Sequence, residues 1–125
     1  MKALILAAGS GKRLGALGKS VAKPMLPILE KPLLEYIIYL MARHGFNDLV
    51  INLFHLAESI KNHFGDGKPW NVNIIYSLET HLLGTAGALT KVRDYFDEPF
   101  LVYYGDNLTN VDLSELWESH QSSSA

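Results

Sequence analysis

Short apolar runs recur along the chain, and longer stretches of mixed polarity separate them. The runs cover residues 2–8, 48–54, 71–78 and 99–107. Strands of a parallel sheet are apolar on both faces, because helices cover each side of the sheet. The runs therefore predict four strands of one parallel sheet.

The stretches between the runs carry the signals of helices. Residues 32–45 place apolar side chains at helical spacing, with Pro32 in the expected first turn and Gly45 after the last. Pro24 and Pro27 exclude a helix through the loop that precedes this segment. Further helices are predicted at 57–65, 84–96 and 112–120.

This alternation of strands and helices predicts an α/β fold, with a Rossmann-like, mostly parallel sheet and helices on both faces. The length of 125 residues fits one domain, expected over 1–120, and residues 121–125 are expected to form a disordered tail. Ligands of such sheets bind at the carboxyl ends of the strands. The loop after the first strand and Asp106 after the fourth are therefore predicted to lie at that edge.

The loop after the first run reads LAAGSGKRLG over residues 6–15, with three glycines and no acidic residue. It fits neither common phosphate-binding pattern: G-x-G-x-x-G requires glycine at position 14, and the P-loop pattern requires glycine at position 13. Small residues nevertheless let backbone N–H groups approach an anion closely. Arg13 would add a forked positive charge, and Lys12 and Lys23 would add point charges, so the loop predicts a triphosphate site.

Charge is spread unevenly along the chain. The net charge is −2, but residues 1–31 hold six basic residues against Glu30 alone. The small overall charge gives no field that would favour nucleic acid or a membrane surface. The basic cluster instead favours a local anion site over a merely solvated surface, because it shares its segment with the glycines.

The remaining composition excludes several classes of protein. The chain has no cysteine, which excludes a disulfide, a zinc–thiolate site and a thiol nucleophile. The first residues make a poor signal peptide, and no apolar stretch approaches the length of a membrane span. A cytoplasmic protein is expected.

Asp106 is a candidate metal ligand. It follows an apolar strand, and Mg2+ in proteins is held by few carboxylates together with substrate phosphates. Taken alone, an aspartate in this position is explained more simply as a turn residue or helix cap. With the basic loop beside it, Asp106 suggests phosphoryl-type chemistry, in which positioning and charge neutralisation dominate.

Four blocks together resemble the sugar-1-phosphate nucleotidylyltransferase family. They are KALILAAGSGKRL, KPMLPILEKPLLEYII, LGTAGAL and FLVYYGDN, in the order of that family and within residues 2–107. The resemblance implies the N-terminal, nucleotide-binding part of a nucleotide-diphospho-sugar transferase fold. It also implies an Mg2+-dependent enzyme that joins a nucleoside triphosphate to a sugar 1-phosphate and releases pyrophosphate.

The same resemblance assigns roles to particular residues. Arg13 would bind the departing pyrophosphate, Lys23 the α-phosphate, and Asp106 the catalytic Mg2+. Gly84 and Thr85 would line the pocket for the base and ribose, with Glu79 as a neighbour. The residues implied to wrap the nucleotide are Ala8, Gly9, Ser10, Gly11, Lys12, Glu79, Gly84 and Thr85.

Departures from the family pattern leave alternatives open. Two prolines and a threonine common in the family are replaced in 13–24, which predicts a looser loop that loses more entropy on binding. The family domain continues past its G-D strand to a sugar-site motif and a second metal-binding aspartate. The alternatives are therefore a nucleotide-binding module without turnover, or an assembly domain that keeps only the fold.

Substrate and assembly are expected only in outline. The blocks favour a hexose 1-phosphate as acceptor, with GTP slightly ahead of UTP and dTTP. An unpaired edge of the fourth strand would favour a homo-oligomer.

Overall fold

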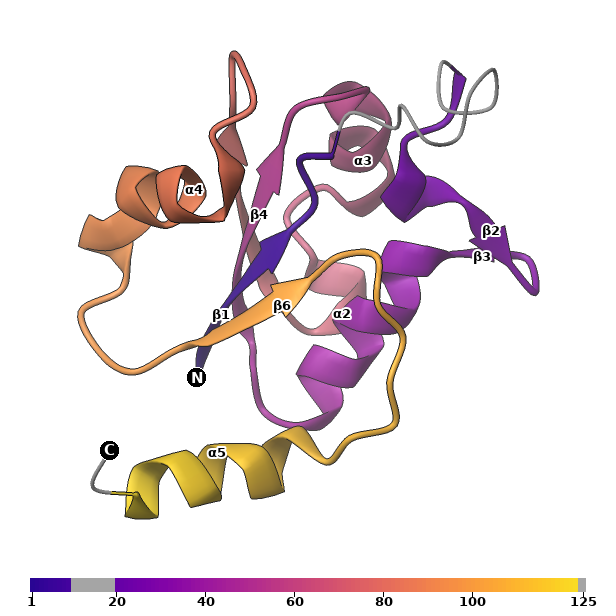
Figure 1. Ribbon diagram of the computed structural model, residues 1–125. Coiled ribbons are helices and arrows are strands. Elements are labelled where there is room, and N and C mark those ends of the chain that lie inside the picture. The colour runs from indigo at the N-terminus through magenta and orange to yellow at the C-terminus, as the bar shows by residue number, and fades with distance from the viewer. Residues whose placement is uncertain (10–19, 124–125) are drawn as a thin grey trace.

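The protein is built around one four-stranded sheet. The computed structural model describes residues 1–9 and 20–123. Within these residues the strand order is β5-β4-β1-β6, and all three pairings are parallel (Figure 1). The strands are β1 (Lys2–Leu6), β4 (Asp48–Leu53), β5 (Asn73–Leu78) and β6 (Leu101–Tyr104).

Helices cover both faces of this sheet. α2 (Leu33–Arg43) and α3 (Ala57–Phe64) lie on one face, and α4 (Gly84–Val92) lies on the other (Figure 1). α5 (Leu113–Ser122) crosses the end at which the strands begin (Figure 1). The fold class predicted from the sequence is confirmed.

Shorter elements complete the chain. Three are single 3-10 turns, and two form a small antiparallel hairpin. They are η2 (Lys23–Met25), η3 (Lys68–Trp70), η4 (Arg93–Tyr95), β2 (Pro27–Ile28) and β3 (Lys31–Pro32). Of the helices in the described residues, none is both long and apolar enough to cross a membrane.

The central strands explain the apolar runs in the sequence. In the register of β1 and β4, Leu4 pairs with Val50 and Ile5 pairs with Ile51. These four side chains are 0–1% exposed. Both faces of the two strands are therefore buried, so helix packing on either side requires apolar residues without alternation.

Several predicted boundaries differ from the observed ones. Residues 121 and 122, expected in a disordered tail, continue α5, and the Ser122 hydroxyl donates to the Ser119 carbonyl. The fourth strand stops at Tyr104 because the chain turns at Gly105. Beyond α4 the predicted helix 84–96 tightens into η4.

Candidate nucleotide site

The carboxyl edge of the sheet brings together two of the predicted catalytic residues. Lys23 of η2 and Asp106, directly after β6, are 83 positions apart in the sequence. The Lys23 Nζ donates to the Asp106 Oδ2 at 2.9 Å. Their side chains are 42% and 44% exposed, so the pair remains open to a ligand from solvent.

Buried neighbours fix the backbone of Lys23. Ala22 is 1% exposed, and Pro24 occupies the first turn of η2 and is buried. The Met25 N–H donates to the Ala22 carbonyl at 2.8 Å. The lysine is thus held between two anchored residues while its own side chain reaches toward Asp106.

A close approach of two strands fixes the position of Asp106. The Gly105 N–H donates to the Leu6 carbonyl at 2.8 Å. A Cβ added at Gly105 would lie 2.9 Å from that carbonyl oxygen and 3.3 Å from the Cβ of Ala7. Only glycine therefore fits here, and Asp106 is held beside the start of the glycine-rich loop. Gly105 is not among the site residues predicted from the sequence.

The residue after Asp106 is also held. The Tyr103 hydroxyl donates to the Asn107 carbonyl at 2.7 Å, which closes a turn around the aspartate. Burial raises the pKa of Tyr103 above its ordinary value, which itself lies well above neutral pH, so the phenol is a donor there. The turn is thus secured on both sides of Asp106.

A buried polar chain lies next to this pair. The Ala7 N–H donates to the Asn52 Oδ1 at 2.6 Å, and the Asn52 Nδ2 donates to the Glu79 Oε1 at 3.0 Å. The Leu83 N–H donates to the Glu79 Oε2 at 3.3 Å. Asn52 and Glu79 are each 4% exposed. The sequence pointed to Glu79 and missed Asn52, although an amide inside the apolar run VINLF was a usable signal.

The other predicted nucleotide residues are placed as follows. Ala8 and Gly9 continue from β1, and a Cβ added at Gly9 would meet no atom of the described residues within 4 Å. Gly84 has φ +70°, a left-handed conformation that favours glycine, and it begins α4 together with the exposed Thr85. Four predicted residues lie outside the described part of the chain: Ser10, Gly11, Lys12 and Arg13.

Asp106 is the carboxylate of this edge that could hold a metal ion. Within 1–9 and 20–123 there is no group of three or more histidine, aspartate or glutamate side chains arranged for a metal. A single half-exposed carboxylate beside a lysine suits Mg2+, which keeps waters and substrate phosphates as its other ligands. The donor set therefore fits a magnesium ion that enters with its nucleotide.

Comparison with known proteins identifies the family. The family model described as nucleotidyl transferase matches residues 2–125. The whole chain is 39% identical to the UTP–glucose-1-phosphate uridylyltransferase of Synechocystis and covers 35% of that protein. The chain is also 36% identical to the D-glycero-alpha-D-manno-heptose 1-phosphate guanylyltransferase of Aneurinibacillus thermoaerophilus. That match includes 96% of this chain and 52% of the guanylyltransferase.

A solved structure agrees with these relatives. HddC from Yersinia pseudotuberculosis, complexed with GMP-PN, superposes with a TM-score of 0.85 at 28% identity, over 97% of this chain and 54% of that one. The chain thus spans between about a third and about half of the length of the proteins it matches. The extent and identity of these matches show that the chain belongs to the nucleotidyl transferase family, whose matched members include sugar-1-phosphate nucleotidylyltransferases.

Proposed function

We propose that this chain provides the nucleotide-binding half of a site that joins a nucleoside triphosphate to a sugar 1-phosphate. The observation that carries the proposal is the Lys23–Asp106 pair, 2.9 Å apart at the edge where the glycine-rich loop begins. A cation and a carboxylate at that edge suit a phosphate and its metal ion. The names of the relatives supply the reaction class.

In the proposed reaction, a phosphate oxygen of the sugar 1-phosphate attacks the α-phosphorus in line. A bond forms between that oxygen and the α-phosphorus, the bond to the β-phosphate oxygen breaks, and pyrophosphate leaves. Lys23 donates to the oxygens of the α-phosphate and stabilises the negative charge in the transition state. Arg13 is the residue proposed to bind the departing pyrophosphate.

Asp106 would hold Mg2+, which neutralises phosphate charge when it is bound. Lys23 would then leave Asp106, because the carboxylate would bind the metal ion and the ammonium would donate to the phosphate. On this proposal the ion pair is the arrangement without substrate, and the two groups would separate when substrate binds. We expect Asp106→Asn to abolish the Mg2+ dependence of nucleotide binding, since the amide carries no charge. Binding that still depends on Mg2+ would reduce Asp106 to a turn residue.

The nucleotide is proposed to be GTP, with UTP and dTTP as competitors, and the acceptor a hexose 1-phosphate. A guanylyltransferase and a complex with GMP-PN stand among the similar proteins, and so does a uridylyltransferase. The second candidate is a module that binds nucleotide without turnover. The chain covers only part of each relative, which is consistent with such a module.

Calorimetric titration tests the proposal. GTP, UTP, dTTP, CTP and ATP are titrated with and without Mg2+, and each sample then receives a mixture of sugar 1-phosphates and a pyrophosphate-release assay. Selective, Mg2+-dependent binding with pyrophosphate release supports the transferase. Binding without release supports the nucleotide-binding module, and absence of binding to all five nucleotides would contradict both.

A further inference from the structure

We propose that Asn52 is a positioning residue that couples the two backbone segments expected to hold the nucleotide. One segment starts at Ala7 and leads to the glycine-rich loop. The other runs from Glu79 through Leu83 to the start of α4. The inference rests on the proposed function, because it concerns how the same site is held in shape.

The place of Asn52 in the sheet makes this coupling possible. Asn52 lies on β4, which runs between β1 and β5, and it pairs with Leu6 on one side and Ser77 on the other. The two nucleotide segments leave β1 and β5 just beyond these partners. A side chain on the strand between them is therefore the shortest route from one segment to the other.

The hydrogen bonds of Asn52 have a fixed direction. Its Oδ1 accepts from the Ala7 N–H at 2.6 Å, and its Nδ2 donates to the Glu79 Oε1 at 3.0 Å. An amide provides both an acceptor and a donor, which a carboxylate or an apolar side chain at position 52 cannot do. The Glu79 carboxyl group accepts from the Asn52 Nδ2 on one oxygen and from the Leu83 N–H on the other.

The chain of bonds is buried and complete. Asn52 and Glu79 are each 4% exposed, and in the described residues no buried side-chain nitrogen or oxygen lacks a hydrogen-bond partner. A buried polar network in which every member is satisfied holds its groups rigidly, and one lost partner leaves an expensive unpaired group. The Ala7 and Leu83 backbones are thus fixed relative to each other.

This rigidity matters for binding because small displacements of contacting groups cost affinity and rate. Ala8 and Gly9 follow Ala7 directly, and Gly84 and Thr85 follow Leu83. The Asn52 amide and the Glu79 carboxyl group link the two segments by hydrogen bonds. Loss of either side chain lets the segments move independently.

The test exchanges the chemistry of the two residues. In Asn52→Asp two carboxylates face each other, and in Glu79→Gln the new amide nitrogen faces the Leu83 N–H. The double variant N52D/E79Q restores every bond, because the amide at position 79 donates to the carboxylate at position 52 and accepts from Leu83. The double variant also keeps the net charge of the wild-type chain.

Two measurements are made on all four proteins. The first is nucleotide affinity by calorimetry at a temperature where each variant is fully folded. The second is the hydrogen exchange of the Ala7 and Leu83 amides by NMR without nucleotide. We expect each single variant to bind on the order of tenfold more weakly and to exchange both amides faster, because a buried group loses its partner. We expect the double variant to return to within about threefold of the wild type.

Asn73→Asp is the matched control. The Asn73 Nδ2 also donates to a carboxylate, the Asp48 Oδ1 at 3.2 Å, but at the exposed amino end of the sheet. Like Asn52→Asp, the Asn73→Asp substitution places two carboxylates face to face. We expect it to leave the nucleotide affinity unchanged. A loss in Asn73→Asp equal to that in Asn52→Asp would overturn the positioning role.

Other outcomes also decide the matter. Single variants that lose melting temperature but keep wild-type affinity would make the network purely structural and overturn the inference. A double variant that binds as weakly as Glu79→Gln would show that Glu79 acts on the nucleotide directly, not through Asn52. If the wild-type chain binds no nucleotide, the proposed function fails. Exchange of the two amides then still decides whether Asn52 couples the segments.

Discussion

The ion pair between Lys23 and Asp106 is half-exposed, so its contribution to the free energy of unfolding is small. Exposed pairs contribute about 0–1 kcal/mol to stability, whereas a lysine that contacts a phosphate contributes directly to binding. We expect Lys23→Ala to weaken triphosphate binding at least about tenfold. We expect the free energy of unfolding to change by less than about 1 kcal/mol. Calorimetry with GTP–Mg2+ and urea denaturation give the two quantities.

Lys61→Ala is the control for that experiment. Lys61 is 40% exposed and pairs with Glu58 at 3.8 Å on α3, so it matches Lys23 in exposure and in having a carboxylate partner. Its removal should leave nucleotide binding unchanged. If Lys23→Ala instead unfolds the protein, or if both variants weaken binding equally, Lys23 does not belong to the site.

Gly105→Ala should damage both the fold and the site. The added methyl would lie 2.9 Å from the Leu6 carbonyl oxygen and 3.3 Å from the Ala7 Cβ, so β6 must move away from β1. Overpacking of this kind costs about 1–3 kcal/mol, and Asp106 moves with the strand. We expect a lower urea midpoint and weaker Mg2+-dependent nucleotide binding.

Gly9→Ala isolates the steric cause. The methyl added there meets no atom of residues 1–9 and 20–123 within 4 Å, so we expect the urea midpoint to stay at its wild-type value. If the Gly105→Ala protein has wild-type stability, the sheet accommodates the added methyl group. The close approach of Gly105 to β1 would then not be what fixes the position of Asp106.

The sequence points to candidate chemical residues of the site and not to the residues that hold them in place. Lys23 and Asp106 stand in motifs, and a motif is visible along the chain. Gly105 and Asn52 act through contacts with Leu6 and Ala7, far away in the sequence, which only the folded sheet brings together. The local sequence does not indicate such contacts. The exception is Asn52, a polar residue inside an apolar run that forms a buried strand.

Among the elements, the link between β5 and α3 is sensitive to alkali. The Tyr76 hydroxyl donates to the Gly65 carbonyl, just after α3, at 2.7 Å. Burial, and next the negative charge of Asp66, raise the pKa of Tyr76 to about 12. The folded state therefore holds this proton more tightly than the unfolded chain does, whose tyrosine pKa is about 10. The resulting stabilisation is complete below pH 10 and is lost as the pH rises toward 12.

Tyr76→Phe removes this contribution. We expect a loss of about 1 kcal/mol at neutral pH, from the missing hydrogen bond. Between pH 9 and 11 its stability should fall less steeply than that of the wild type. Urea denaturation across this range measures both effects. Parallel curves for the two proteins would mean that Tyr76 titrates as an ordinary tyrosine.

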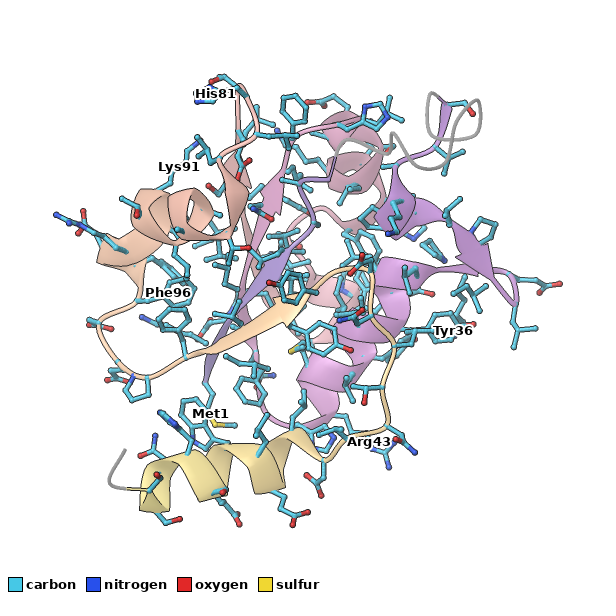
Figure 2. All side chains as sticks on the ribbon, viewed as in Figure 1. Met1, Tyr36, Arg43, His81, Lys91 and Phe96 are labelled. Carbon is cyan, nitrogen blue, oxygen red and sulfur yellow. The ribbon has the colours of Figure 1, made fainter. Side chains whose placement is uncertain are left out.

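Elements were predictable where one simple pattern dominates. The strands and helices followed from apolar runs and helical spacing, since the packing of helices on a sheet selects those patterns. The β2–β3 hairpin did not, because its turn residues Leu29 and Glu30 have φ of 49° and 75°. Such turns ordinarily call for Asn-Gly. Here the Tyr36 hydroxyl of α2 secures the hairpin by donating to the Ile28 carbonyl at 2.6 Å (Figure 2 labels Tyr36).

At the scale of the whole molecule, the two ends of the sheet have different roles. The carboxyl edge carries Lys23, Asp106 and the Asn52 network. The amino end is closed by α5. The ring of Trp117 packs edge-on against that of Phe46, with 5.5 Å between the ring centroids, and the Asp112 Oδ1 caps the helix by accepting from the Ser114 N–H at 2.9 Å. Stability and ligand binding are thus separated along the strands, so α5 can hold the fold without touching the site.

The two side edges of the sheet also differ. On the outer side of β5, the Ile74 N–H donates to the Asp66 carbonyl at 2.9 Å, and the Leu78 carbonyl accepts from the Nζ of Lys91 on α4 (Figure 2 labels Lys91). In the described part of the chain, β6 pairs only with β1. Its outer edge therefore presents backbone groups without strand partners. Val102 and Tyr104 on β6 are 38% and 52% exposed.

An open strand edge with exposed apolar side chains is a template for pairing with another chain. We expect this 125-residue chain to self-associate through β6, with two copies meeting edge to edge about a twofold axis. A lysine on an edge strand opposes such pairing, so Val102→Lys should weaken association on the order of tenfold. Nucleotide binding should be unaffected, because Val102 precedes the carboxyl edge. Sedimentation velocity over a range of concentrations measures the association.

The Ile75→Lys variant distinguishes pairing of β6 edges from non-specific association of exposed apolar side chains. Ile75 is 47% exposed on β5, so the substitution removes a similar apolar surface and adds the same charge at the opposite edge. Because local contacts already occupy the outer side of β5, we expect Ile75→Lys to associate as the wild type does. Equal loss in both variants would indicate non-specific apolar contact, and a wild-type chain that stays monomeric at all concentrations would rule out β6 as a self-association edge.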